Sequence, residues 1–314
     1  MKKILLATTL LAATTGFAAA EVTLSGDARM GIISNFDNAA TLLVNESDLQ
    51  FTSRARVKFT LSGSTDGGLE FGASFRADNA GASTSVAKGA DGIVGTADDI
   101  VTVGGGAVNG GAGSVFISGA FGKLSMGDVD DAANSAVGQV SGVGLTGLSD
   151  LNEVTYIGIG NDPTALYEYS TGDLTIYASV TNPTIPATVV AYSVAAKYAL
   201  GDYTVALGYE SNDAGTDHVI VGATATFGAA TVKAIYGSAT GTIKGDQYAL
   251  SVDYKIDATT VTAFYADDSK LGGAEAYGLG ASYDLGGGAS VVGGYSHNQT
   301  SNQDAYDLGV SMSF

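Results

Sequence analysis

The sequence predicts an all-β protein, a 16-stranded antiparallel transmembrane β-barrel, and three observations lead to this expectation. Residues 305–314 alternate between apolar side chains and small or polar ones, as a strand with one apolar and one polar face does. The same alternation recurs along the chain between turn residues. It is better explained by a sheet between lipid and water than by a soluble sandwich. Mean hydropathy is positive, yet no apolar run long enough for a membrane helix follows the N-terminal segment.

Sixteen segments show the alternation, an even number, as a closed barrel with both termini in the periplasm requires. The connections between them alternate in length. We expect the short ones in the periplasm and the longer acidic or Gly/Asn-rich ones outside the cell. The expected strands are residues 22–33, 50–62, 69–78, 114–120, 123–128, 165–170, 174–180, 189–200, 203–210, 219–227, 231–238, 247–256, 260–266, 276–285, 289–296 and 305–314.

Residues 1–20 have the features of an export signal that is removed. Lys2 and Lys3 precede an apolar run, and three alanines precede Glu21. The run is too short for a membrane-spanning helix, so an N-terminal anchor is the weaker alternative. The mature protein is then expected to be one barrel domain, residues 21–314.

Composition excludes several other classes of function. The chain has no cysteine, so disulfides and thiolate chemistry are excluded. Its formal net charge of −18 and the lack of a basic patch argue against nucleic acid as a partner. Tryptophan is absent, so an aromatic belt at the membrane boundary must use tyrosine and phenylalanine, although tyrosines could also fill a soluble core. The tyrosines expected in such a belt are Tyr169, Tyr192, Tyr203, Tyr209, Tyr248, Tyr254, Tyr277, Tyr283 and Tyr295.

All four arginines of the chain fall on the polar faces of the first three expected strands. An arginine that faces lipid at mid-bilayer costs roughly 2–4 kcal/mol, so these side chains are expected to point into an aqueous lumen. Lys58 also lies on the polar face of its expected strand. The alternative is that the arginines pair with neighbouring acids such as Asp27 and Glu70. The expected basic wall consists of Arg29, Arg54, Arg56, Lys58 and Arg76.

Residues 128–163 contain no clean strand, and an irregular stretch of this length is usually functional or disordered. If it folds into the lumen, its carboxylates face the basic wall, and a transverse field tunes the charge preference of a pore. The alternative is an acidic loop outside the cell. The acids concerned are Asp128, Asp130, Asp131, Asp150, Glu153 and Asp162.

Several sequence blocks resemble those of alphaproteobacterial general porins of the Rhodobacter type. The blocks are residues 21–31, 53–57, 68–73, 119–123, 126–128 and 277–288, and the resemblance extends over the mature chain. It implies sixteen strands, a homotrimer, a third loop folded into the lumen, and passive diffusion of small hydrophilic solutes. It also implies a constriction at Arg29, Arg54, Arg56 and Arg76 opposite acids of that loop. Residues 135–148 depart from the pattern, because glycine, serine and valine replace acids there and suggest a less negative constriction.

The second outer loop, expected at residues 79–113, is unusually long and carries clustered carboxylates. Asp91, Asp98 and Asp99 lie on a glycine-rich turn that could bind Ca²⁺ through oxygen atoms. The spacing lacks the regular ligand pattern of an EF-hand, so a solvated acidic turn is favoured. A latch onto a neighbouring subunit is another role for this loop. No cofactor is expected to be required.

A general diffusion pore in the outer membrane of a Gram-negative bacterium is therefore the leading hypothesis. Its expected partners are outer-membrane lipid and lipopolysaccharide, two further copies of the chain, and small solutes and ions. A solute-selective channel is a close alternative. A barrel enzyme is less favoured, because His218 and His297 lie at strand ends as expected solvated loop residues with no apparent nucleophile partner. A secreted Ca²⁺-binding surface protein remains a third alternative.

Overall fold

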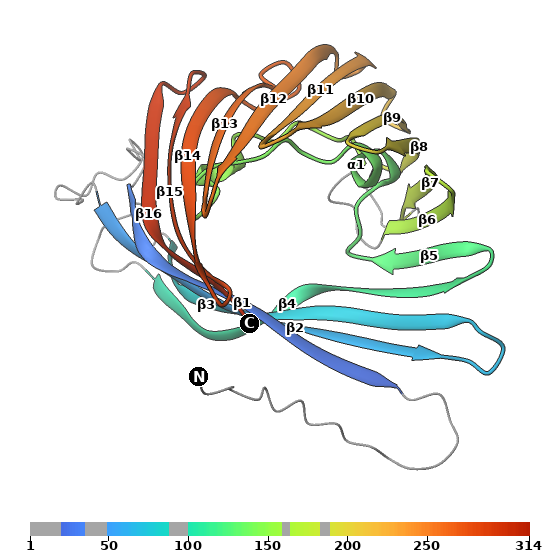
Figure 1. Ribbon diagram of the computed structural model, residues 1–314, viewed down its shortest axis with the longest axis horizontal. Coiled ribbons are helices and arrows are strands. Elements are labelled where there is room, and N and C mark those ends of the chain that lie inside the picture. The colour runs from blue at the N-terminus through green and yellow to red at the C-terminus, as the bar shows by residue number, and fades with distance from the viewer. Residues whose placement is uncertain (1–19, 35–48, 88–99, 159–163, 183–188) are drawn as a thin grey trace.

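The computed structural model describes residues 20–34, 49–87, 100–158, 164–182 and 189–314, which form a single closed barrel (Figure 1). One short α-helix and one 3-10 helix lie between the fifth and sixth strands. The elements are β1 (Glu21–Ser34), β2 (Leu49–Ser64), β3 (Glu70–Ala87), β4 (Ile100–Gly119), β5 (Gly122–Gly127), α1 (Ala132–Val137), η1 (Leu148–Asp150), β6 (Thr164–Thr171), β7 (Leu174–Thr181), β8 (Ala191–Leu200), β9 (Tyr203–Asn212), β10 (Thr216–Phe227), β11 (Ala230–Gly241), β12 (Gly245–Ile256), β13 (Thr259–Asp267), β14 (Glu275–Gly286), β15 (Ala289–Asn298) and β16 (Gln303–Ser313).

Every strand pairs antiparallel with its neighbours in sequence, and β1 pairs with β16 to close the ring. Met30 lies opposite Val310 in this seam. The chain end extends the seam, because Gly26 and Phe314 exchange two backbone hydrogen bonds of 3.2 and 2.9 Å. A closed ring leaves no unpaired strand edge, which a membrane-spanning sheet requires. The prediction of a 16-stranded antiparallel barrel is confirmed.

The third and fourth strands are longer than the sequence indicated. Residues 79–113 were expected to be a loop, but β3 continues to Ala87 and β4 begins at Ile100, with Val86 paired opposite Val101. The extension is rich in glycine, alanine and serine, whose small side chains give no clear apolar alternation although the backbone still pairs. Asp91, Asp98 and Asp99 lie outside the described residues.

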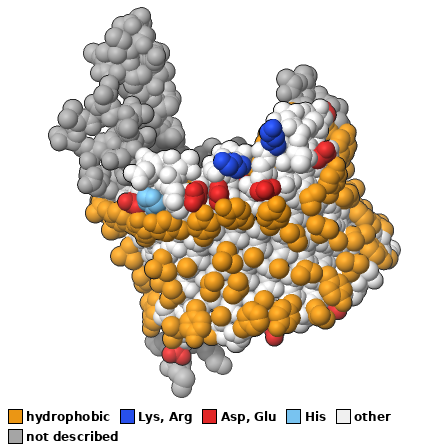
Figure 2. All heavy atoms as spheres, turned by 90° about the horizontal axis from the view of Figure 1, so that it is seen from above, with side chains coloured by type: hydrophobic (Ala, Val, Ile, Leu, Met, Phe, Trp, Pro, Cys, Tyr) orange, Lys and Arg blue, Asp and Glu red, His pale blue; other side chains and the backbone are white. Residues whose placement is uncertain are grey.

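The outer surface of the barrel is apolar, and one of its rims carries charge (Figure 2). Alternation along β10 shows the reason: Val219 and Val221 are exposed outward, whereas Ile220 between them is fully buried on the inner side. All nine tyrosines expected in an aromatic belt are exposed. Several donate their hydroxyl groups to carboxylates, as Tyr209 does to Asp217 at 2.8 Å. Such rings have an apolar body for lipid and a polar tip for the water boundary. Among the described residues, neither helix is long and apolar enough to cross a membrane.

Candidate functional site

The segment between β5 and β6 lies inside the ring, along the inner surface of the opposite strands (Figure 1). We call its described part, residues 128–158, the inner loop. Glycines on the wall make room for it. A Cβ atom at Gly208 would lie 2.6 Å from the Cβ of Ala133, and one at Gly222 would lie 2.7 Å from Val137. Only a residue without a side chain permits so close an approach.

The hydrophobic core of the described chain lies between this loop and the wall. Ala132, Ala133 and Leu148 are essentially inaccessible to solvent, and they belong to one buried cluster with Ile220 of β10 and Phe264 of β13. Burial of apolar surface is the main stabilising term in such contacts. The loop is therefore a packed part of the barrel interior, which agrees with the expectation of a loop folded into the lumen.

Wall side chains also bind the loop backbone. Ser179 of β7 and Ser193 of β8 accept hydrogen bonds from the amides of Ala132 and Ala133, at 2.8 and 2.9 Å. These amides belong to the first turn of α1, where a helix has no internal acceptors. Further along, Ser141 donates its hydroxyl to Asp253 of β12 at 2.6 Å.

The far end of the loop is held by a single carboxylate. Asp307 of β16 is buried and accepts three hydrogen bonds, from the amides of Leu145 and Thr146 and from the Thr146 hydroxyl, at 2.7 to 2.8 Å. Arg29 of β1 donates to the carbonyl of Leu145 at 3.4 Å. The loop therefore spans the inner surface from β7 to the β16–β1 seam.

Replacing Gly294 of β15 with alanine should displace this end of the loop. The new Cβ atom would lie 2.5 Å from the backbone nitrogen of Gly144, a contact with main chain that cannot rotate away. We expect altered single-channel conductance with unchanged barrel content by circular dichroism. Gly67→Ala is the matched control, because its Cβ atom would approach only Thr65, at 3.9 Å. Unaltered conductance in Gly294→Ala would show that the loop does not limit conduction.

Strand register brings the basic residues of β1, β2 and β3 together. Arg29 lies opposite Arg54, and Lys58 lies opposite Arg76. Like charges placed directly across a ladder are destabilising, so the cluster is not explained by stability. The basic wall consists of Arg29, Arg54, Arg56, Lys58 and Arg76, all on the inner phase of their strands.

Two carboxylates of the same strands pair with three of these arginines. Arg54 lies 3.0 Å from Asp27, while Asp78 bridges Arg56 at 3.2 Å and Arg76 at 2.6 Å. The alternative that the arginines form ion pairs with neighbouring acids is therefore correct in part. Asp27 is one of the expected acids, and Asp78 takes the place of Glu70. Five cations against two carboxylates leave the wall an excess of three positive charges.

Four of the predicted acids are exposed on the inner loop, namely Asp128, Asp130, Asp150 and Glu153, which we call the acidic edge. Asp128 and Asp130 line a recess of about 650 Å³ together with Lys58 and Lys123. Partial desolvation by the surrounding barrel interior, and then the charge of Asp128, raises the pKa of Asp130 above its ordinary value. The same desolvation raises the pKa of Glu153, and the charges of Asp150 and Asp130 add to this effect. The edge thus concentrates negative charge near lysines of the opposite strands.

Asp131 does not belong to this edge. It is the N-cap of α1, where its carboxylate accepts from the amide of Asn134 at 2.9 Å, and it is only 2% exposed. Burial and then the nearby Glu210 carboxylate raise its pKa. The sequence grouped it with its neighbours, but the start of the helix turns its side chain toward the wall. Asp162 lies outside the described residues.

Sequence reasoning missed three inward lysines and misjudged one histidine. Lys123, Lys197 and Lys233 lie on the inner phase of β5, β8 and β11, a phase that alternation would have indicated. His218 was expected to be solvated, yet it is fully buried beneath the inner loop, because no local pattern indicates that the loop covers it. Within the described ranges, no group of three or more metal-ligating side chains is suited to a metal ion.

Comparison with known proteins gives consistent matches over nearly the full chain. Residues 7–303 match the family model described as Gram-negative porin. The porin of Rhodobacter capsulatus is 38% identical, with 94% of this chain and all of that protein covered. A porin structure refined at 1.8 Å resolution has a TM-score of 0.70 at 36% identity, again over 94% and 100% of the two chains. A variant of the Rhodopseudomonas blastica porin shares the fold, with a TM-score of 0.73 at 24% identity and the same coverage.

Proposed function

The chain belongs to the Gram-negative porin family, and we propose that solutes cross it between two oppositely charged surfaces, the basic wall and the acidic edge. As a member of this family it is a general diffusion porin of the outer membrane rather than an enzyme. The observation that carries the charged constriction is the position of the inner loop against β7–β16. It leaves the lumen between that loop and strands β1–β6.

The two surfaces would act through the field between them. Side chains in a narrow aqueous passage with low-dielectric walls interact more strongly than they do in bulk water. Dipolar solutes and hydrated ions can align in such a field, whereas an apolar molecule must displace ordered water. The three excess charges of the basic wall, opposed by four acids, support a pore with weak net charge preference.

A graded set of neutral sugars tests the diffusion function. We expect proteoliposomes to swell at rates that fall smoothly with solute size, and planar bilayers to show ohmic channels without a saturating solute. Strong saturation by one sugar at low concentration would contradict a general pore and favour a solute-selective channel. Absence of conductance after confirmed insertion would contradict both.

A homotrimer is the proposed assembly. The exposed outer faces of β2 and β3 carry large apolar side chains, including Phe51, which is 94% exposed, and Phe75. These apolar faces are the proposed contact surfaces between copies, which a closed three-fold symmetry would repeat. Conductance steps in groups of three, and a gel band that shifts on boiling, are the expected results. Single steps and one unchanged band would contradict the trimer.

Contact with lipopolysaccharide is proposed at the charged rim. Asp217, Asp267 and Asp304 accept hydrogen bonds from exposed tyrosines there. Carboxylates at this level can hold phosphate-bearing lipid through bridging divalent cations. Lipopolysaccharide that copurifies with the protein should be lost on washing with chelator. If the retained amount does not change, the cation bridge is wrong.

Two further proposals concern residues 1–20 and the carboxylates Asp91, Asp98 and Asp99. Residues 1–20 are a signal that is removed, so the mature N-terminus should be Glu21 by Edman or mass analysis. No cofactor is needed for conduction, and Ca²⁺ at Asp91, Asp98 and Asp99 is the weaker alternative to a solvated turn. Calorimetric titration with Ca²⁺, repeated on Asp98→Asn/Asp99→Asn, distinguishes these two.

A further inference from the structure

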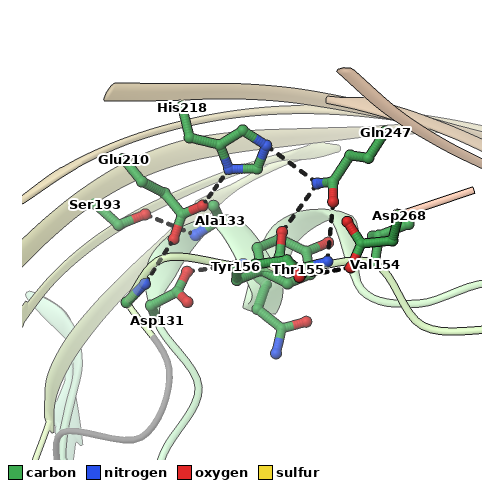
Figure 3. Close-up of polar contacts among 12 residues, drawn as sticks. Asp131, Ala133, Val154, Thr155, Tyr156, Ser193, Glu210, His218, Gln247 and Asp268 are labelled. Atoms are coloured by element: carbon green, nitrogen blue, oxygen red, sulfur yellow. Dashed lines mark hydrogen bonds and ion pairs between the residues drawn. The ribbon is translucent and has the colours of Figure 1, made fainter. Parts of the chain in front are cut away.

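A buried polar cluster holds the returning part of the inner loop, residues 154–158, to the wall (Figure 3). Glu210 of β9, His218 of β10 and Gln247 of β12 are completely buried there. Glu210 accepts a hydrogen bond from the amide of Gly158 at 3.2 Å, and its other oxygen lies 2.7 Å from Nδ1 of His218. The pore function described above makes no use of this cluster.

The orientation of the Gln247 amide is set by the loop. Its Oε1 accepts from the amide nitrogen of Thr155, and its Nε2 donates to the carbonyl of the same residue, both at 2.9 Å. The reverse orientation would place an NH₂ group against the Thr155 N–H and an oxygen against the Thr155 carbonyl. The two hydrogen bonds with Thr155 therefore determine which terminal atom of the Gln247 amide is oxygen and which is nitrogen.

This orientation determines the state of His218. The Nε2 of Gln247 lies 3.1 Å from the Nε2 of His218, and an amide NH₂ can only donate. The imidazole nitrogen must accept, so the ring is neutral and its hydrogen is on Nδ1, where it is donated to Glu210. Gly237 of β11 makes space for this contact, because a Cβ atom there would lie 2.6 Å from His218 and 2.7 Å from Gln247.

We propose that His218 and Gln247 are positioning residues for the pore constriction, and that a proton on His218 releases residues 154–158 from the wall. A second ring hydrogen, on Nε2 of His218, would face the NH₂ group of Gln247, so two hydrogen-bond donors would oppose each other. If Gln247 turns over to relieve this contact, it loses both bonds to Thr155. The inference rests on the proposed function, since release of the loop matters for transport only if the loop bounds the pore.

The other titratable groups around His218 are Glu210 on β9, Asp131 before α1, Tyr156 of the inner loop and Asp268 after β13. Both oxygens of Glu210 accept hydrogen bonds, whereas Asp131 and Asp268 each have one oxygen without a partner among the described atoms. Burial raises the pKa of both Asp131 and Asp268. Asp268 accepts the Thr155 hydroxyl on one oxygen, and its other oxygen has no partner among the described atoms, so a proton fits there. A proton on Asp131 or Asp268 leaves the loop bonds intact, whereas a second proton on His218 conflicts with the bonds of Gln247 to the loop.

Histidine side chains commonly change protonation between about pH 5 and 8, which is a range a bacterial surface meets. In the protonated state, Thr155 would lose its two backbone bonds to Gln247, and residues 154–158, held by fewer contacts, would move toward the lumen. We expect more frequent partial closures and lower mean conductance in acid. Loss of the Thr155 bonds should raise hydrogen exchange at its amide by about tenfold, as expected for a buried hydrogen bond.

The test compares two histidine variants of the detergent-purified, full-length porin between pH 8 and pH 5. In His218→Gln, a side-chain carbonyl can accept from Gln247 at the position of the ring nitrogen, and it gains no proton. His297→Gln is the matched control, since the second histidine of the chain lies at the rim beside Asp304. Hydrogen exchange of the peptide that covers Thr155 is measured beside single-channel conductance, with variants compared at equal pH.

In the wild type and in His297→Gln, we expect hydrogen exchange at Thr155 to rise and mean conductance to fall between pH 8 and pH 5. In His218→Gln, neither change should occur. A response that persists in His218→Gln, or is lost in His297→Gln, overturns the proposal. An exchange response without any conductance response supports the pH-dependent release of residues 154–158 and contradicts the proposed constriction instead. Gln247→Leu should show acid-like exchange at every pH, and wild-type exchange in this variant would also overturn the proposed release.

Discussion

Replacing Arg54 and Arg56 together with glutamine should shift the pore strongly toward cations. The two side chains lie on the inner phase of β2 at the centre of the basic wall. When a permeating ion passes at about 7 Å from a side-chain charge in water, that unit charge changes the energy of the ion by about 0.6 kcal/mol. Two charges therefore change local ion occupancy by about sevenfold before screening. The reversal potential across a tenfold salt gradient measures this shift, which should shrink as salt increases.

The matched control removes two positive charges away from the constriction. Lys244 and Lys270 are exposed near the outer ends of β12 and β13, so Lys244→Gln/Lys270→Gln should leave the reversal potential nearly unchanged. Equal shifts in both double variants would mean that overall charge, rather than the basic wall, sets ion preference. No shift in Arg54→Gln/Arg56→Gln would refute the basic wall.

Asp307→Ala should free the far end of the inner loop while the barrel stays folded. The change removes three hydrogen bonds and leaves the buried amide of Leu145 and the half-buried amide of Thr146 without a partner. Each unsatisfied buried group costs about 1–3 kcal/mol, so the local penalty is on the order of 3 kcal/mol or more. We expect large conductance fluctuations, with hydrogen exchange accelerated by at least about a hundredfold around residues 143–148.

Asp304→Ala, on the same strand but at the exposed rim, is the control and should leave both measurements unchanged. The sheet hydrogen bonds of the β16–β1 seam do not depend on the Asp307 side chain. The heat-modifiable gel shift should therefore persist in both variants. Quiet channels and wild-type exchange in Asp307→Ala would mean that the apolar contacts of the loop suffice to hold it.

The alternation of side chains predicted the strands well, because the period of a strand is a local property. Arg54 and Arg56 could be assigned to the lumen from phase alone, and register then brings them beside Arg29 and Arg76. Alternation gives no signal where side chains are small. Between residues 79 and 113 the sequence is rich in glycine and alanine, and this composition conceals a ladder that continues to Ala87.

The inner loop was harder to predict, because its contacts join residues that are far apart in sequence. Gly158 bonds to Glu210, and Leu145 bonds to Asp307, and neither bond leaves a periodic signal in the sequence. The phase of β10 places His218 on the inner side, but the phase does not indicate a covering loop. The wall glycines gave the one available signal, since a side chain at Gly208 would collide with Ala133.

The β16–β1 seam has a consequence for mechanical unfolding. Every other pairing joins strands adjacent in sequence, whereas this seam joins the two ends of the barrel chain and includes the bonds between Gly26 and Phe314. Pulling on either terminus must first open the seam, after which hairpins can be extracted one at a time. A force–extension trace should therefore begin with one distinct rupture and continue as a series of smaller steps, each about two strands long.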